Sequence, residues 1–165
     1  MKEILFMLSF LMYTFTTMTL YQGWGSDSQP FTSPAIVNEA AAPAWEEQIN
    51  QLSNSPKSPK EKASVVEKLA KEYKPTTEEL EEFKVHIVNE FINLRYLSDT
   101  SNDSYMLSNM FQAIALENHD VNLVRDFAEA FYHNTKNVYT GAVEPGSDSV
   151  LEYEEQMFKA INAGY

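Results

Sequence analysis

The sequence predicts an all-α protein: five or six short helices, packed antiparallel or orthogonally, follow an N-terminal apolar helix and a flexible tether. Two observations predict this class. From Pro43 onward, helix-starting and helix-ending residues alternate, and the apolar residues between them recur every three or four positions. No segment shows the sustained polar–apolar alternation of a strand, and the one candidate, Val138–Val143, is short.

The first expected element is the apolar helix. Residues 4–21 form 18 positions without a charged side chain, and a helix of that length spans roughly 27 Å, close to the thickness of a membrane core. Lys2 precedes this segment and the next basic residue is Lys57, so the positive-inside rule predicts that the rest lies outside the cytoplasm. We expect residues 1–21 to be a membrane anchor or a signal segment.

The residues after this segment leave its cleavage open. Gly23 and Gly25 place small side chains two positions apart, but they do not form an Ala-x-Ala site. An uncleaved anchor is the favoured expectation and a cleaved signal is the alternative. Turn- and coil-forming residues then predict a polar linker over 22–43, followed by an α-helical extracytoplasmic domain over 44–165.

Two helices are expected at the start of this domain. Pro43 can occupy the first position of a short helix that ends near Leu52. Ser58-Pro59-Lys60-Glu61 is a capping box with proline at the first helical position, and it predicts a second helix that ends near Tyr73.

The third expected helix carries a broad apolar stripe. Thr76-Thr77-Glu78-Glu79 forms another capping box, and the helix is predicted to end near Leu97. Val85 and Ile92 widen its apolar stripe, and a helix that is apolar over so much of its circumference is expected to be central.

Three further helices complete the prediction. Asn102 or Asp103 caps a helix that closes at residues 117–119, and Asp120 caps the next, which ends near Lys136. After the loop 138–146, Ser149-Val150-Leu151-Glu152 forms a third capping box, and Gly164 is expected just past the end of the last helix.

Charge and composition exclude several classes of function. A net charge of −12 argues against nucleic acid as a partner, because neutralising phosphates requires clustered Lys and Arg. The absence of cysteine excludes disulfides and cysteine-ligated metals. The sequence contains neither a glycine-rich phosphate loop nor a Gly-x-Ser-x-Gly elbow, so no cofactor is expected.

The candidate metal ligands are His86, Glu90, His119 and His133. His86 and Glu90 are four residues apart, so both can face one side of a helix, but a helical metal site needs a third ligand. The favoured interpretation is structural: His86 is partly buried, and His119 and His133 complement helix ends. A metal-dependent hydrolase that uses these histidines is the alternative.

Two charged surfaces are the candidate partner-binding sites. Glu78, Glu79 and Glu82 crowd one helix start, where the helix dipole stabilises anions, and Lys60, Lys68 and Lys71 lie on the preceding helix. Residues 57–74 contain six lysines and three glutamates. This basic segment is expected to dock on the Glu-rich helix start or to face solvent; an anionic surface is the other candidate for contact.

Several features occur in a recognisable order: the apolar segment with its polar tether, a helix pair around Asn118-His119-Asp120 that leads to His133-Asn134, and a glycine-containing loop before Glu152-Tyr153-Glu154-Glu155. In them the chain resembles a family of small, uncharacterised, N-terminally anchored proteins of Gram-positive spore-forming bacteria. Val138-Tyr139 stands where that family has a tryptophan, and Thr140-Gly141 replaces its Gly-Gly pair. The resemblance implies attachment at the cell envelope and no particular reaction.

The expected function is therefore non-enzymatic. The chain is predicted to be a membrane-tethered or secreted helical domain that binds a protein partner at the cell envelope, with residues 4–21 contacting the membrane. Besides the hydrolase, the alternative is a secreted, cleaved effector or immunity-type protein.

Overall fold

The computed structural model describes residues 44–164, and all regular structure within them is helical. These residues belong to one unit that runs from Ala40 to Tyr165. The predicted apolar helix and tether lie outside the described residues. Among the helices that are described, none is long and apolar enough to cross a membrane.

Two of the first three helices begin at side-chain caps. Helix α1 (Trp45–Ser53) follows Ala44, which provides no side-chain cap; the predicted role of Pro43 falls outside the described residues. Helices α2 (Pro59–Glu72) and α3 (Thr77–Ile92) begin at complete capping boxes, with Ser58 and Thr76 as the capping residues. Both capping-box predictions are confirmed.

The second half contains α4 (Asp103–Ala115), the 3₁₀ turn η1 (Leu116–Asn118), α5 (Asn122–Tyr139) and α6 (Asp148–Asn162). Asn102, one of the two predicted caps, accepts a hydrogen bond from the backbone of Tyr105 at 3.1 Å. Gly164 has a φ of 106° and follows the C-cap Ala163, as predicted.

Four predicted boundaries are wrong. Helix α5 runs to Tyr139 rather than ending near Lys136, so it includes the start of the predicted loop. Helix α3 ends at Ile92 rather than near Leu97, because the chain turns through the left-handed residue Leu94, two positions after the helix end. Asp120 does not cap α5, since that helix begins one residue later, after Val121. Ser149 lies inside the first turn of α6 because Ser147 is the N-cap, so the third capping box does not form.

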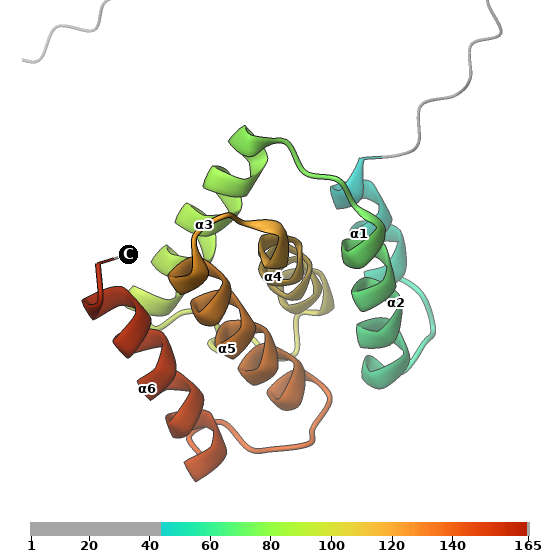
Figure 1. Ribbon diagram of the computed structural model, residues 1–165. Helices are drawn as coiled ribbons and strands as arrows, with labels where there is room; N and C mark the ends of the chain where they lie inside the picture. Colours follow the sequence, from blue (N-terminus) through green and yellow to red (C-terminus); the bar gives the residue numbers. More distant parts are fainter. Residues whose placement is uncertain (1–43, 165) are drawn as a thin grey trace, which may run out of the picture. The chain divides into compact units, whose positions relative to one another are not determined.

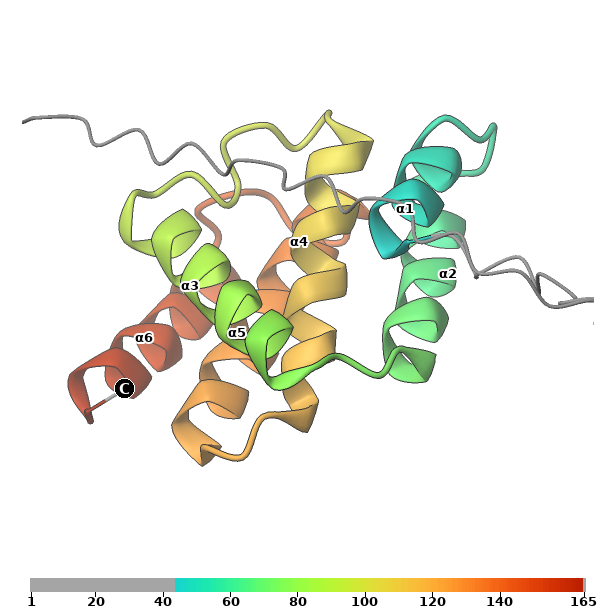
Figure 2. The same cartoon turned by 90° about the horizontal axis from the view of Figure 1, so that it is seen from above.

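The central helix is α4, not α3. Nine of its residues are buried, and it contacts α1, α2, α3 and α5, whereas α6 packs on α5. Figures 1 and 2 show α4 and α5 between the α1–α2 pair on one side and α3 and α6 on the other. Phenylalanines fill the interior, among them Phe91, Phe111, Phe127 and Phe131.

Helix α3 is peripheral because only one of its faces meets the core. Phe83, Ile87 and Phe91 point inward, whereas the side chains of Val85 and Ile92 are 55% and 56% exposed. The apolar residues that made this helix look central therefore include side chains on an outer face that the described part of the chain does not cover.

Candidate functional site

His119 is held by the fold through both ring nitrogens. Its Nδ1 accepts a hydrogen bond from the backbone N–H of Val121 at 3.1 Å, so the proton is on Nε2, which lies 3.2 Å from Oε1 of Glu81. The His119 carbonyl accepts a hydrogen bond from Arg125 at 2.7 Å. His119 therefore fastens the turn before α5 to α3, with both ring nitrogens engaged.

The structure does not gather the predicted metal ligands into one cluster. Nε2 of His86 lies 2.9 Å from Oδ1 of Asn109, whereas the Glu90 carboxylate accepts a hydrogen bond from the Tyr105 hydroxyl. His133 lies on α5, where its ring stacks on a tyrosine of α6. Within residues 44–164, no group of three or more His, Asp or Glu side chains is arranged to hold a metal ion.

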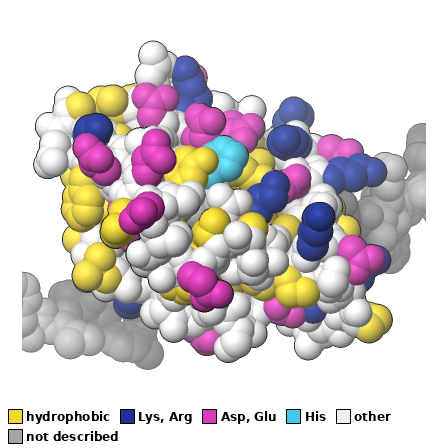
Figure 3. Space-filling view, turned by 90° about the horizontal axis from the view of Figure 1, so that it is seen from below, with side chains coloured by type: hydrophobic (Ala, Val, Ile, Leu, Met, Phe, Trp, Pro, Cys, Tyr) yellow, Lys and Arg dark blue, Asp and Glu magenta, His cyan; other side chains and the backbone are white. Residues whose placement is uncertain are grey.

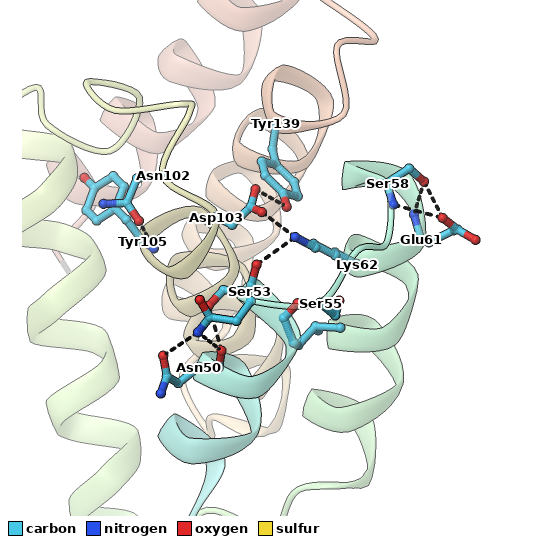
Figure 4. A network of polar contacts seen from close by, with 12 residues as sticks. Asn50, Ser53, Ser55, Ser58, Glu61, Lys62, Asn102, Asp103, Tyr105 and Tyr139 are labelled. Atoms are coloured by element: carbon cyan, nitrogen blue, oxygen red, sulfur yellow. Dashed lines mark hydrogen bonds and ion pairs between the residues drawn. The ribbon is translucent and has the colours of Figure 1, made fainter.

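A buried lysine joins four helices. Nζ of Lys62 donates hydrogen bonds to the Ser53 carbonyl at 2.7 Å and to Oδ2 of Asp103 at 2.5 Å. Oδ1 of Asp103 accepts a further hydrogen bond from the Tyr139 hydroxyl at 2.7 Å. Figure 4 shows these contacts converging from the end of α1, the first turns of α2 and α4, and the end of α5. We call Lys62, Asp103 and Tyr139 the buried clamp.

The charges of the clamp are fixed by its own contacts. Burial raises the pKa of Asp103, but the hydrogen bonds from Lys62 and Tyr139 outweigh burial and hold the pKa below its ordinary value. Burial, together with the neighbouring carboxylate, raises the pKa of Tyr139. At neutral pH the Asp103 carboxylate is ionised and the Tyr139 hydroxyl is protonated. The carboxylate then accepts hydrogen bonds from both Lys62 and Tyr139, and the clamp is structural.

One of the predicted partner-binding residues is committed to the fold. The Glu79 carboxylate accepts hydrogen bonds from the Tyr73 hydroxyl and from the backbone N–H of Thr76, the latter at 2.7 Å. The hydrogen bond from Tyr73 is the largest cause that lowers the pKa of Glu79. Glu79 closes the α2–α3 connection and is not a free surface group.

The remaining predicted partner-binding residues are exposed. Glu78 and Glu82 lie on α3, and Lys60, Lys68 and Lys71 lie on α2. Helix α2 packs on α1, α4 and α5 rather than on α3, so the basic segment does not dock on the Glu-rich helix start. Lys60, Lys68 and Lys71 face solvent, whereas Lys62 is buried in the clamp. On the face shown in Figure 3, Lys and Arg side chains lie mostly toward the side of α1 and α2.

The exposed side of α3 combines acidic and apolar groups. A shallow hollow of about 580 Å³ follows it, lined by Glu78, Glu81, Glu82, Val85, His86 and Asn89. Further along the same side lies Ile92, and Leu94, two residues after the helix ends, has 72% of its surface exposed. We call Glu78, Glu82, Val85, Ile92 and Leu94 the outer face of α3.

Leu94 has an unusual backbone conformation. Its φ is +54°, and it is the one non-glycine residue with positive φ among residues 44–164. The N–H of Leu94 donates to the Phe91 carbonyl at 2.9 Å, and the N–H of Arg95 donates to the Glu90 carbonyl at 2.8 Å. These two bonds define a Schellman motif, in which the left-handed position normally belongs to glycine.

Two other helices, α5 and α6, are followed by a left-handed residue, and in both that residue is glycine. Helix α5 ends in the same pair of bonds, from Gly141 to Val138 at 3.0 Å and from Ala142 to Asn137 at 2.8 Å. The left-handed residue there is Gly141, with a φ of +71°. Of the three helices that are followed by a left-handed residue, α5 and α6 use glycine at that position, whereas α3 uses leucine.

A second hollow lies between α5 and α6. It has a volume of about 510 Å³, and its walls include Asp126, Glu129, His133 and Tyr153. The rings of His133 and Tyr153 stack with centroids 5.4 Å apart, and Nε2 of His133 lies 3.9 Å from Oε1 of Glu129. The histidine is thus packed against α6 beside one carboxylate.

The chain matches no family model, no curated protein and no solved structure. The functional conclusion therefore depends on the geometry alone.

The sequence analysis does not predict two features of the structure, the conformation of Leu94 and the burial of Lys62. The left-handed conformation of Leu94 is not predicted because the expected helix runs past this residue and leucine rarely adopts that conformation. The prediction for the basic segment places Lys62 in solvent with the other lysines. Lys62 instead lies four residues before the buried Val66, on the same buried side of α2. Helical spacing was the signal that could have found it.

Proposed function

We propose that this protein is a non-enzymatic module that binds a protein partner through the outer face of α3. Leu94 carries the proposal. A left-handed backbone costs a non-glycine residue about 1–2 kcal/mol, and the side chain gains little burial in return because it is mostly exposed. Backbone strain of this kind concentrates at functional sites.

The neighbours of Leu94 support the same conclusion. Val85 and Ile92 are more than half exposed, although α3 packs its other face normally into the core. Exposed apolar side chains on one surface, bordered by polar groups, are typical of protein-binding sites. The predicted histidine sites offer no comparable support for a hydrolase, because the rings of His86 and His119 are hydrogen-bonded within the fold.

The proposal includes attachment at the cell envelope. Residues 4–21 would anchor the chain in the membrane and residues 22–43 would give the helical domain reach on the outer side. The mass of the mature protein tests the attachment: an intact Met1 supports an anchor, and a start near Ser26 supports a secreted form.

Site-specific photo-crosslinking tests the binding face. A photoreactive residue is placed at Ile92 in the full chain, in the cells that produce the protein, and the matched control position is Ser64, which is exposed on α2. We expect a discrete crosslinked protein from position 92 that is absent from position 64 and weakened by Leu94→Ala. Identical products from both positions, or none from position 92, would refute the proposed binding face.

A further inference from the structure

We infer that the partner presents an amphipathic helix with a basic end to the outer face of α3. This inference rests on the proposed function and specifies the chemistry of the partner at the same site.

The acidic end of the face calls for a basic partner. Glu78 and Glu82 are exposed, and neither forms an ion pair among the described residues. Glu81 beside them is already paired with Lys84 and hydrogen-bonded to His119. Two free carboxylates therefore lie at one end of the face, and the net charge of −12 would attract a basic partner further.

The apolar end sets the shape of the partner. Val85 and Ile92 are seven residues apart on one stripe of α3, or about 10 Å along the helix axis, and Leu94 is a third exposed apolar residue, two positions after the helix ends. An extended peptide normally binds by pairing with a strand edge, and residues 44–164 contain no strand. A second helix can instead lay its own apolar ridge along the face.

A second copy of this chain fits the face poorly. Antiparallel pairing of two α3 helices about Val85 would place Glu78 of one copy against Ile92 of the other, which buries a carboxylate on an apolar group. Helix α2 of a second copy could offer Lys60, Lys68 and Lys71 to the acidic end. It has no exposed large apolar side chain that could cover Ile92 and Leu94. A different protein, with basic and apolar residues on one helix, meets both requirements.

The order of the groups suggests an orientation. In an antiparallel arrangement, the partner's N-terminal half would cover Val85, Ile92 and Leu94, and its C-terminal half would lie over Glu78 and Glu82. Basic residues near the C-terminus also stabilise the partner's own helix through its dipole. We therefore expect the partner helix to carry apolar residues in its N-terminal half and Lys or Arg residues one to two turns later.

A pair of synthetic peptides tests this chemistry. The probe is an 18-residue peptide with leucines at i, i+4 and i+7 in its first half, three arginines in its second half, and alanine and glutamine elsewhere. Its twin has glutamates in place of the arginines. Binding to the full chain is measured by calorimetry, and amide chemical shifts locate the binding site.

The matched variants remove two carboxylates each. Glu78→Gln/Glu82→Gln alters the outer face of α3, whereas Asp126→Asn/Glu129→Gln removes the same charge from exposed positions on α5. We expect the basic peptide to shift amides at residues 85–95. The α3 variant should weaken it roughly three- to tenfold, as two exposed ion pairs would, and the α5 variant by less than twofold.

The outcomes separate this inference from the proposed function. Equal affinity for both peptides, equal effects of the two variants, or shifts confined to the α5–α6 hollow would overturn the basic-helix inference. If crosslinking from position 92 still captures a partner in those cases, the binding face stands and only the chemistry assigned to the partner is wrong. If crosslinking from position 92 captures no partner, the proposed binding face and the basic-helix inference are both wrong.

Discussion

Replacing Leu94 by glycine is expected to relieve strain at the end of α3. The residue has a φ of +54° within a complete Schellman motif. Glycine avoids the left-handed penalty of about 1–2 kcal/mol, but it loses about 0.5–1 kcal/mol through the greater freedom of the unfolded chain. The net gain over a residue with a Cβ atom is about 0.5–1 kcal/mol.

Leu94→Ala is the matched reference for this effect. Both variants remove the side chain beyond Cβ, so the small burial of Leu94, which is 72% exposed, cancels between them. We expect glycine to exceed alanine by about 0.5–1 kcal/mol in unfolding free energy, or roughly 2–5 °C in Tm. Urea unfolding of the full chain, followed by helical circular dichroism, measures the difference.

The mirror experiment uses the end of α5. Gly141 occupies the same position with a φ of +71°, and a Cβ added there would meet no atom within 4 Å. Gly141→Ala is therefore expected to lose about 0.5–1 kcal/mol from backbone strain alone. If glycine is no better than alanine at position 94, while Gly141→Ala is costly, Leu94 is unstrained and the main support for the binding face is lost.

The other predictions concern the interior and the helix ends. Lys62→Ala leaves Asp103 without its ion pair and is expected to cost about 3–5 kcal/mol of unfolding free energy; a loss below 1 kcal/mol would show that the clamp is not structural. The folded pKa of Asp103 is lowered, so its contribution to stability is present above its unfolded pKa and is lost as pH falls through the folded pKa. Asp103→Asn should accordingly flatten the decline in unfolding free energy below about pH 4, and an unchanged acid slope would contradict the assignment. Thr76→Ala removes a real cap and should cost about 1 kcal/mol, whereas Ser149→Ala, at the capping box that does not form, should change stability by less than about 0.5 kcal/mol; equal losses in thermal unfolding would refute the assignment of caps.

Local signals predicted much of the fold. The helix starts at Ser58 and Thr76 were predictable because each capping box is complete within four residues. The box at Ser149 failed because Ser147 lies two residues earlier and starts α6 there, which keeps Val150 buried. The start of α6 is thus not set by a side-chain cap, because the Ser147 side chain makes no capping hydrogen bond.

The candidate site was harder to predict for two physical reasons. The end of α3 depends on a leucine in a conformation that the sequence gives no reason to expect. The exposure of Val85 and Ile92 depends on which helix becomes central, and that follows from packing among distant segments rather than from the pattern within one helix. Of the three predicted acidic residues, Glu78 and Glu82 are exposed, whereas the Glu79 carboxylate accepts a hydrogen bond from Tyr73.

The crosslinking yield of Leu94→Gly tests the central claim most directly. The photoreactive residue stays at position 92, and the yield is compared with that of the native chain at equal abundance. If Leu94 is kept at the end of α3 because it contacts a partner, glycine should leave the protein at least as stable and reduce the yield several-fold. An unchanged or increased yield from the stable glycine variant would show that the outer face of α3 does not bind through Leu94.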